Sequence, residues 1–221
     1  MTNDLTSAIE AERRRGDFAI FDFDHTCIKA DIGEALMNHF VAVGRLHGAL
    51  LEEYESLLDQ GRIREAYILY GEMLEGFSEQ EVVTAVQATI KELGGLEVHT
   101  SVIELMEYLR QRGVSIWIMS ASHELAVRIA AQQVGINAQI IGIRNVILDG
   151  RFAAQLQKPT SMLEGKVECM RTYIHPTQNP LIVVDDSSTG LPLLQTAKIK
   201  VVVNRDPEFV AHARQNGWFI L

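Results

Sequence analysis

Residues 18–26 have the sequence FAIFDFDHT, and this stretch decides the fold. Its apolar beginning predicts a strand over Phe18–Phe23 that is covered on both faces. Two carboxylates, Asp22 and Asp24, stand at the carboxyl end of that strand. There, one carboxylate can attack an electrophilic phosphorus, and the pair can approach a divalent cation. The stretch therefore predicts a site for phosphoryl transfer at the edge of a buried sheet.

Four further apolar runs, each short and rich in β-branched residues, follow along the chain. They predict strands over Val114–Met119, Ala138–Ile143, Leu181–Val184 and Lys200–Val203. Helical patterns are found over Ser101–Gln111, His123–Val134, Glu164–Ile174 and Leu191–Thr196, and a last helix begins at Pro207 and ends before Gly217. This alternation predicts a three-layer α/β/α fold, a Rossmann-like parallel sheet with helices on both sides.

One long stretch interrupts the alternation. From Asp31 to about Glu92 the apolar residues recur at helical spacing, with no convincing strand. This stretch is too long for a single crossover between strands. We therefore expect an inserted all-helical cap, residues 31–94, within an α/β core of residues 1–30 and 95–221.

Glycines mark the expected ends of this cap. The segment near Gly33 is the expected outgoing hinge, and the pair Gly94-Gly95 is the expected return hinge. A second exception to the alternation, Val146–Ala154, has Asp149-Gly150 at its centre. This pattern predicts a β-hairpin with a two-residue turn.

Three further motifs, each just past an apolar run or at a helix start, could act on a phosphoryl group. The hydroxyl of Ser120 and the backbone N–H groups of Ser120 and Ala121 precede a predicted helix and can bind a phosphoryl oxygen. Lys166 opens another helix, where its ammonium can neutralise the transferring group. Asp185 and Asp186 follow the strand Leu181–Val184 and suit metal ligation.

Each of these motifs also has an ordinary structural interpretation. Ser122 is a good N-cap candidate for the helix that follows, and one acid of the pair at 185 and 186 can also cap a helix. Lys158 is a rival for the role of Lys166, although Pro159 and the polar residues around it indicate an exposed loop. The case for a site depends on the motifs occurring together.

In this order and at the ends of these strands, the four motifs resemble the haloacid dehalogenase-like phosphatase superfamily, and in particular its phosphoserine phosphatase-like branch with a helical cap. The resemblance covers most of the chain. It implies that Asp22 is the nucleophile and Asp24 the acid and base, and that Ser120 and Lys166 bind phosphate. It also implies a Mg²⁺ cofactor, held by Asp22, the backbone carbonyl of Asp24 and the acidic pair. The implied partner is a small phosphorylated metabolite.

One position departs from the family pattern. Relatives often carry a second acid where this chain has Gly190, while Asp186 falls on the first acid of the pattern. Adjacent acids are used by some members, so Asp185 can substitute for the missing one. Otherwise the metal is bound weakly, or the protein has lost turnover.

Asp31 is the main indication of a substrate. It falls where phosphoserine phosphatases carry a glutamate that contacts the substrate's ammonium, so the resemblance implies an amine-bearing phosphomonoester such as phosphoserine, phosphoethanolamine or phosphocholine. Its alternative role is the N-cap of the first cap helix. His25 is a second candidate on the substrate side. Arg62 and Arg64 are candidates for holding a substrate carboxylate.

Composition limits the partners. The chain of 221 residues has a formal net charge of −9 and contains two cysteines. No basic block is present, so nucleic acid and anionic membranes are not expected partners. No apolar run has the length of a membrane span, and the low cysteine content suits a reducing interior, so we expect a cytoplasmic location. We expect a monomer or homodimer.

Two rival functions remain open at this point. A phosphotransferase or mutase would pass the phosphoryl group from the aspartate to another hydroxyl on the same scaffold. A catalytically degenerate protein would bind a phosphorylated ligand without turnover, and Gly190 motivates that alternative.

Overall fold

A six-stranded sheet forms the centre of the core, and its strand order in the computed structural model, which describes residues 2–221, is β3-β2-β1-β6-β7-β8. The strands are β1 (Phe18–Phe21), β2 (Ser115–His123), β3 (Gln139–Ile143), β6 (Ile182–Asp185), β7 (Ile199–Val202) and β8 (Phe219–Ile220). All neighbouring pairs are parallel. The five strands predicted from apolar runs are confirmed, and the two-residue β8 is an addition at one edge.

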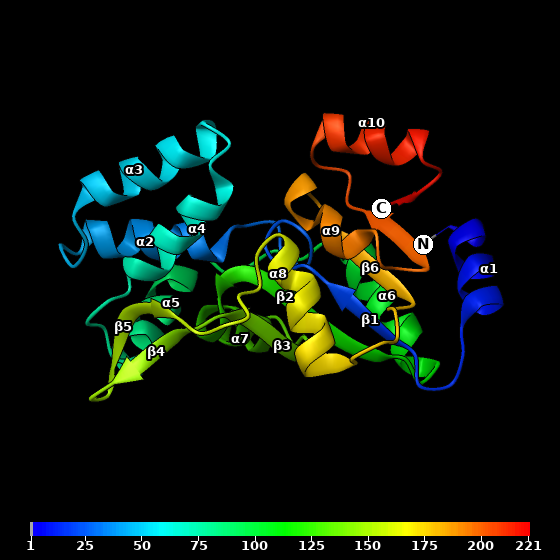
Figure 1. Ribbon diagram of the computed structural model, residues 1–221, viewed down its shortest axis with the longest axis horizontal. Coiled ribbons are helices and arrows are strands. Elements are labelled where there is room, and N and C mark those ends of the chain that lie inside the picture. The colour runs from blue at the N-terminus through cyan, green and yellow to red at the C-terminus, as the bar shows by residue number, and fades with distance from the viewer. Residues whose placement is uncertain (1) are drawn as a thin grey trace.

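Helices cover both faces of this sheet, as Figure 1 shows. They are α1 (Asn3–Glu12), α6 (Thr100–Gln111), α7 (Glu124–Gln133), α8 (Glu164–Cys169), which continues as a π-helix (Met170–Ile174), α9 (Leu191–Leu194) and α10 (Pro207–Gln215). Alternate residues of β1 enter different clusters: Ala19 and Phe21 pack with α1, α6 and α7, whereas Phe18 and Ile20 pack with α8, α9 and α10. The three-layer α/β/α fold is therefore confirmed.

Helix α1 was not foreseen, because its sequence is mostly polar. Thr2 caps the helix by accepting a hydrogen bond from the backbone N–H of Leu5. Leu5 and Ile9 are fully buried against the core, and the other side of the helix faces solvent. Two apolar residues four positions apart are thus enough to dock this helix on the sheet.

Four helices lie between β1 and α6, where the sequence predicts the inserted cap. They are α2 (Ile32–Ala42), α3 (Gly48–Asp59), α4 (Ile63–Glu72) and α5 (Glu79–Glu92). In Figure 1 they form a separate group beside the sheet, above the hairpin of β4 and β5. We propose residues 31–94 as the limits of the cap. Among residues 2–221, no helix is long and apolar enough to cross a membrane.

The two connections between cap and core lie side by side. Ile28 and Val98 form an antiparallel bridge, the N–H of Lys29 donates to the carbonyl of Glu97, and the N–H of His99 donates to the carbonyl of Cys27. Gly33 itself lies in the first turn of α2, so the outgoing hinge stays a prediction for the connecting segment just before this helix. At position 33 a Cβ would come within 2.5 Å of Ser122 Oγ, so glycine allows the cap and core to approach closely.

The predicted hairpin is present as β4 (Asn145–Leu148) and β5 (Arg151–Leu156). Asp149 and Gly150 both have positive φ, 50° and 77°, as a tight two-residue turn requires. The hairpin packs against the cap: the side-chain amide of Asn145 donates to the carbonyl of Gly71 in α4. This core segment therefore supports the helix that carries part of the pocket wall.

Candidate active site

The candidate site lies at the carboxyl ends of three neighbouring strands in the middle of the sheet. Asp22 directly follows β1, Ser120 lies in β2, and Asp185 ends β6. The N–H of Asp22 donates to the carbonyl of Val184, so the β1–β6 pairing extends to Asp22. Three motifs that are far apart in the sequence therefore meet at one edge of the sheet.

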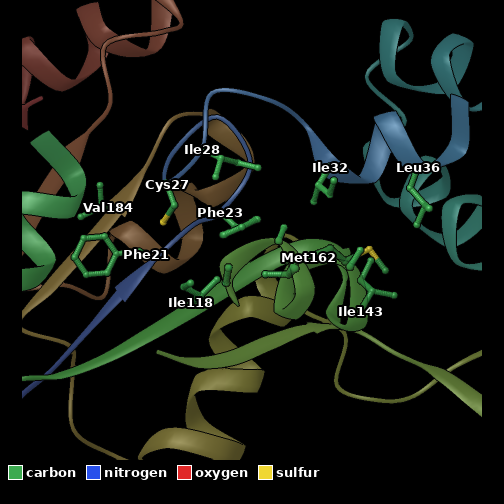
Figure 2. Close-up of a cluster of buried hydrophobic side chains, with 14 of the residues drawn as sticks. Phe21, Phe23, Cys27, Ile28, Ile32, Leu36, Ile118, Ile143, Met162 and Val184 are labelled. Atoms are coloured by element: carbon green, nitrogen blue, oxygen red, sulfur yellow. The ribbon is translucent and has the colours of Figure 1, made fainter. Parts of the chain in front are cut away.

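The loop after β1 is held by an apolar anchor. Phe23, which separates Asp22 from Asp24, is fully buried, and its carbonyl accepts hydrogen bonds from the N–H groups of Thr26, Cys27 and Ile28. Figure 2 shows Phe23 among buried side chains that include Ile28 and Met162. Because buried Phe23 fixes the backbone between the two acids, the side chains of Asp22 and Asp24 contact different sets of residues.

Lys166 links the first and last motifs. Its Nζ donates to Asp22 Oδ1 at 2.7 Å and to Asp185 Oδ2 at 3.2 Å, and its side chain is 3% exposed. Burial alone would lower the pKa of Lys166, but the charges of Asp185 and Asp22 outweigh it and hold that pKa above its ordinary value. Its rival Lys158 is exposed. The buried ammonium thus stays charged beside Asp22.

Asp22, Asp185 and Asp186 form an acidic cluster, in which one carboxylate oxygen from each lies within 4.8 Å of the others. Burial raises the pKa of Asp22 well above its usual value, and Asp185 and Asp186 add to the effect, against the opposing charge of Lys166. Carboxylate oxygens crowded in this way are hard ligands of the kind that Mg²⁺ prefers. The donor set therefore fits a divalent cation.

Asp186 is held through both of its carboxylate oxygens. Thr26 Oγ1 donates to Oδ1 at 3.1 Å, and Arg205 Nη1 donates to Oδ2 at 2.6 Å. Arg205 lies in the loop after β7 and was not predicted to belong to the site. Thr26 belongs to the first motif, so its contact connects the loop after β1 to the acid after β6.

Gly190 bears on the departure from the family pattern. A Cβ at this position would overlap the carboxylate of Asp185. The space that a side chain at 190 would need is thus filled by the acid at 185. This overlap favours the interpretation that Asp185 substitutes for the missing acid.

The Asp24 side chain is committed to a different set of partners. Its Oδ1 accepts from the N–H of Ile32 at 2.7 Å, and its Oδ2 accepts from Ser120 Oγ at 3.1 Å and from Ser122 Oγ at 2.8 Å. Burial, followed by the charge of Asp31, raises the pKa of Asp24 to about 7. Only the backbone carbonyl of Asp24 remains as a possible metal ligand. The carboxyl is placed to exchange a proton near neutral pH.

The prediction that Ser122 caps the helix after β2 was wrong. Helix α7 begins at Glu124, its N-cap is His123, and Ser122 instead bonds to Asp24. Ser120 Oγ also accepts from the N–H of Ser122 at 2.9 Å. Ser120, Ala121 and Lys166, the three residues expected to bind phosphate, all line the pocket.

The pocket between cap and core has a volume of about 220 Å³. This is below the range of about 300–1,000 Å³ for drug-sized ligands, so the site suits a small substrate. Asp31 lines the pocket and also caps α2, because its Oδ1 accepts from the N–H of Glu34. The expected N-cap role of Asp31 is therefore confirmed, and its position in the pocket leaves contact with a substrate ammonium as a prediction. His25 lines the pocket too, with its Nε2 at 3.8 Å from Asp31 Oδ2.

The two arginines proposed to hold a substrate carboxylate lie outside this pocket. Arg62 pairs with Glu65, and Arg64 pairs with Glu164, all on exposed surface. Three tyrosines from the cap, Tyr54, Tyr67 and Tyr70, line the pocket instead. A sequence signal for two of them was available, because Tyr67 and Tyr70 are three residues apart and share one face of a helix.

The family model for haloacid dehalogenase-like hydrolases matches residues 19–195. The chain belongs to this family of hydrolases. Among curated relatives, it is 23% identical to phosphorylcholine phosphatase from Pseudomonas aeruginosa PAO1, over 93% of this chain and 80% of the relative. It is 24% identical to histidinol-phosphatase from Neisseria meningitidis serogroup C strain 8013, over 93% of this chain and 98% of the relative.

Solved structures show the same fold. A protein of unknown function from Bordetella pertussis Tohama I superposes with a TM-score of 0.82 at 17% identity, covering 94% of this chain and 99% of its own. A substrate-bound phosphoserine phosphatase superposes with a TM-score of 0.65 at 14% identity, covering 95% of this chain and 94% of its own. At these identities the likeness concerns the fold, including the cap.

Proposed function

We propose that the protein is a Mg²⁺-dependent phosphatase that hydrolyses a small, amine-bearing phosphomonoester through an aspartyl-phosphate intermediate. The observation that carries this proposal is the buried Lys166 between Asp22 and Asp185, since it places a fixed cation beside a carboxylate at the edge of the sheet. An ammonium held there binds phosphate oxygens and leaves the carboxylate free to act as nucleophile.

In the first half-reaction, an Asp22 oxygen forms a bond to phosphorus while the bond from phosphorus to the ester oxygen breaks. The departing alkoxide takes the proton of the Asp24 carboxyl, whose raised pKa keeps that proton available near neutral pH. Ser120 and Ala121, which line the pocket from β2, would bind the phosphoryl oxygens.

In the second half-reaction, the Asp24 carboxylate takes a proton from a water molecule, and the resulting hydroxide attacks the aspartyl-phosphate. The bond from phosphorus to Asp22 breaks, which restores the Asp22 carboxylate and releases inorganic phosphate. Asp22, Asp185, Asp186 and the carbonyl of Asp24 would hold Mg²⁺. When bound, the cation offsets the repulsion between the nucleophile and the phosphate.

Asp31 supports an amine on the substrate, because it brings a carboxylate to the cap side of the pocket. The names of both curated relatives refer to phosphate esters of amino alcohols, which is consistent with this assignment. Cys27 and Cys169 are both buried and free, and we keep the cytoplasm as the proposed location.

The test is phosphate release from a panel of small phosphomonoesters, with and without Mg²⁺, for the wild type and for Asp22→Asn. We expect turnover that requires Mg²⁺ and falls by at least about a thousandfold in Asp22→Asn. Product analysis with added acceptor alcohols separates hydrolysis from phosphotransfer. A folded wild type that binds phosphate but turns over no ester would refute the proposal and support a degenerate binding protein.

A further inference from the structure

The two walls of the pocket differ in charge, which narrows the substrate class within the proposed phosphatase function. The core wall contains both fully cationic residues that line the pocket in the described part of the chain, Lys166 and Arg205. Each is already paired with carboxylates of the acidic cluster. The cap wall consists of acidic, aromatic and apolar residues: Asp31, Gly33, Glu34, Tyr54, Leu58, Tyr67 and Tyr70.

Among residues 2–221, the cap wall offers no cationic side chain to a substrate carboxylate. Arg62 and Arg64 pair with Glu65 and Glu164 outside the pocket. A carboxylate on the leaving group would instead face two acids, Asp31 and Glu34. These acids lie close enough together that, after burial, the charge of Asp31 contributes to raising the pKa of Glu34. A second negative charge at this wall would be repelled.

The aromatic part of the cap wall suits a cation that carries no N–H groups. The ring centroids of Tyr54 and Tyr70 lie 6.2 Å apart with the planes tilted by 46°. Tyr70 is fixed in place because its Oη accepts from the N–H of His123. Tyr67, one helical turn before Tyr70, lines the same pocket. Aromatic faces attract cations without hydrogen bonds, which is how quaternary ammonium groups are bound.

A primary ammonium has three N–H donors that must find acceptors when the pocket closes. At this wall it would depend on Asp31 Oδ2 and the Glu34 carboxylate, because Asp31 Oδ1 and Tyr70 Oη already accept from the N–H groups of Glu34 and His123. An alkylated ammonium keeps its attraction to the acids and the rings and leaves no donor unpaired.

We propose that the leaving group of the substrate is an amino alcohol whose nitrogen is alkylated, with phosphocholine as its simplest representative, and that substrates with a carboxylate beside the amine are rejected. The inference rests on the proposed phosphatase function but separates this chain from the phosphoserine phosphatases that share its fold. Tyr54, Tyr67 and Tyr70 are the residues that determine this specificity.

The experiment compares kcat/KM for four esters: phosphocholine, its uncharged isostere with a tert-butyl group in place of trimethylammonium, phosphoethanolamine and phosphoserine. We expect phosphocholine to exceed its uncharged isostere by about 2- to 30-fold, the range of a cation–aromatic contact, and to exceed phosphoethanolamine by a smaller factor, because a primary ammonium is also attracted to aromatic rings. Phosphoserine should be the poorest of the four. A ratio of one between phosphocholine and its isostere, or a preference for phosphoserine, would overturn the proposal.

Variants of Tyr54 identify the aromatic ring as the cause. Tyr54→Phe keeps a π-face and should keep the phosphocholine-to-isostere ratio, whereas Tyr54→Leu should lower that ratio toward one. A loss of folding lowers both rates together and leaves the ratio unchanged, so the readout is independent of the amount of folded protein. Tyr173→Leu, an exposed change outside the pocket, is the matched control.

Calorimetric titration of the Asp22→Asn protein with phosphocholine and with the isostere separates the two proposals. If no ester is hydrolysed by the wild type, the phosphatase function fails, while tighter binding of phosphocholine would still support the inference. If esters are hydrolysed but the isostere binds as tightly as phosphocholine, the inference fails and the phosphatase function stands.

Discussion

The close approach of Gly190 to Asp185 leads to a prediction at the residue scale. Introducing the acid that relatives often carry, Gly190→Asp, should weaken Mg²⁺ binding by about tenfold or more, because its Cβ would displace the Asp185 carboxylate. Calorimetric titration with Mg²⁺ measures the effect. Gly48→Ala is the matched control, since a Cβ at position 48 meets only an ordinary contact with Val41.

A double variant tests the same explanation in reverse. Asp185→Gly combined with Gly190→Asp moves the acid to the usual family position and removes the overlap. We expect it to bind Mg²⁺ more tightly than Gly190→Asp alone. Equal affinities in the two variants would mean that overlap with Asp185 is not the reason for glycine at position 190.

His123 should make stability depend on pH. It is buried, both ring nitrogens lack a hydrogen-bond partner among residues 2–221, and burial lowers its pKa from 6.5 to about 4. Because the folded state holds the neutral ring, this contribution to stability is present above about pH 6.5 and is lost as the pH falls toward 4. The loss amounts to about 3 kcal/mol in the free energy of unfolding.

The measurement is urea unfolding of wild type and His123→Gln at pH 7 and pH 4.5, without metal. The fall in stability between the two pH values should be smaller in His123→Gln by about 2–3 kcal/mol. Comparing two proteins cancels the titration of the buried acids, which both share. The control His212→Gln, at an exposed position, should lose as much stability between pH 7 and pH 4.5 as the wild type. If His123→Gln also loses as much as the wild type, His123 is not the source of the pH dependence.

At the scale of elements, the contact between the hairpin and α4 holds the tyrosine-bearing helix in place. The buried Asn145 donates through Nδ2 to the carbonyl of Gly71 at 2.8 Å and to that of Ala153 at 2.7 Å. Asn145→Asp keeps the shape but sets carboxylate oxygens against two carbonyls. We expect a loss of about 3 kcal/mol or more in the free energy of unfolding, measured with urea.

The same substitution should affect the pocket, because α4 carries Tyr67 and Tyr70. Under conditions in which the variant is folded, its ratio of kcat/KM for phosphocholine to that for the uncharged isostere should be smaller than in the wild type. Asn38→Asp, on the exposed side of α2, is the control for the added charge. A stable Asn145→Asp variant with full preference would show that the hairpin does not support this wall.

At the scale of the whole molecule, metal binding should stabilise the entire fold. The acidic cluster joins residues from β1 and β6 across the centre of the sheet, and unfolding separates them. Mg²⁺ at a hundred times its dissociation constant should therefore add about 2.7 kcal/mol to the free energy of unfolding. Thermal unfolding should shift upward by about 5–10 °C, and a chelator should reverse the shift.

Asp186→Asn provides the check on this prediction, since it removes one charged ligand and keeps the side-chain volume. The Mg²⁺-dependent shift should be much smaller in this variant. An equal shift in both proteins would place the stabilising cation outside the acidic cluster.

Much of this architecture was predictable because its signals are local. Buried strands such as Phe18–Phe21 are short apolar runs, and the cap helices carry apolar stripes at helical spacing. The candidate site was predictable where side chains directly follow strands, as Asp22 and Asp185 do. Helix α1 and strand β8 were not predicted, because each has too few apolar residues to form a recognisable pattern. Those residues become buried only through packing on the sheet.

The features that were missed in the site depend on tertiary contacts. Ser122 looks like a helix cap in the sequence, but in the fold its hydroxyl donates a hydrogen bond to Asp24 instead. Arg205 and Tyr54 reach the pocket from segments whose local pattern carries no such signal. Gly33 lies in the first turn of α2, where the absence of a side chain lets this helix approach β2.

The position of the cap within the chain also has a consequence for biosynthesis. Strand β1 leaves the ribosome before either of its sheet neighbours, because these begin at Ser115 and at Ile182. The cap helices, whose contacts are local, can form in the meantime, whereas β1 has no strand to pair with. The nascent chain therefore exposes an aggregation-prone segment until these neighbours have been translated, and we expect chaperones to associate with it during that interval.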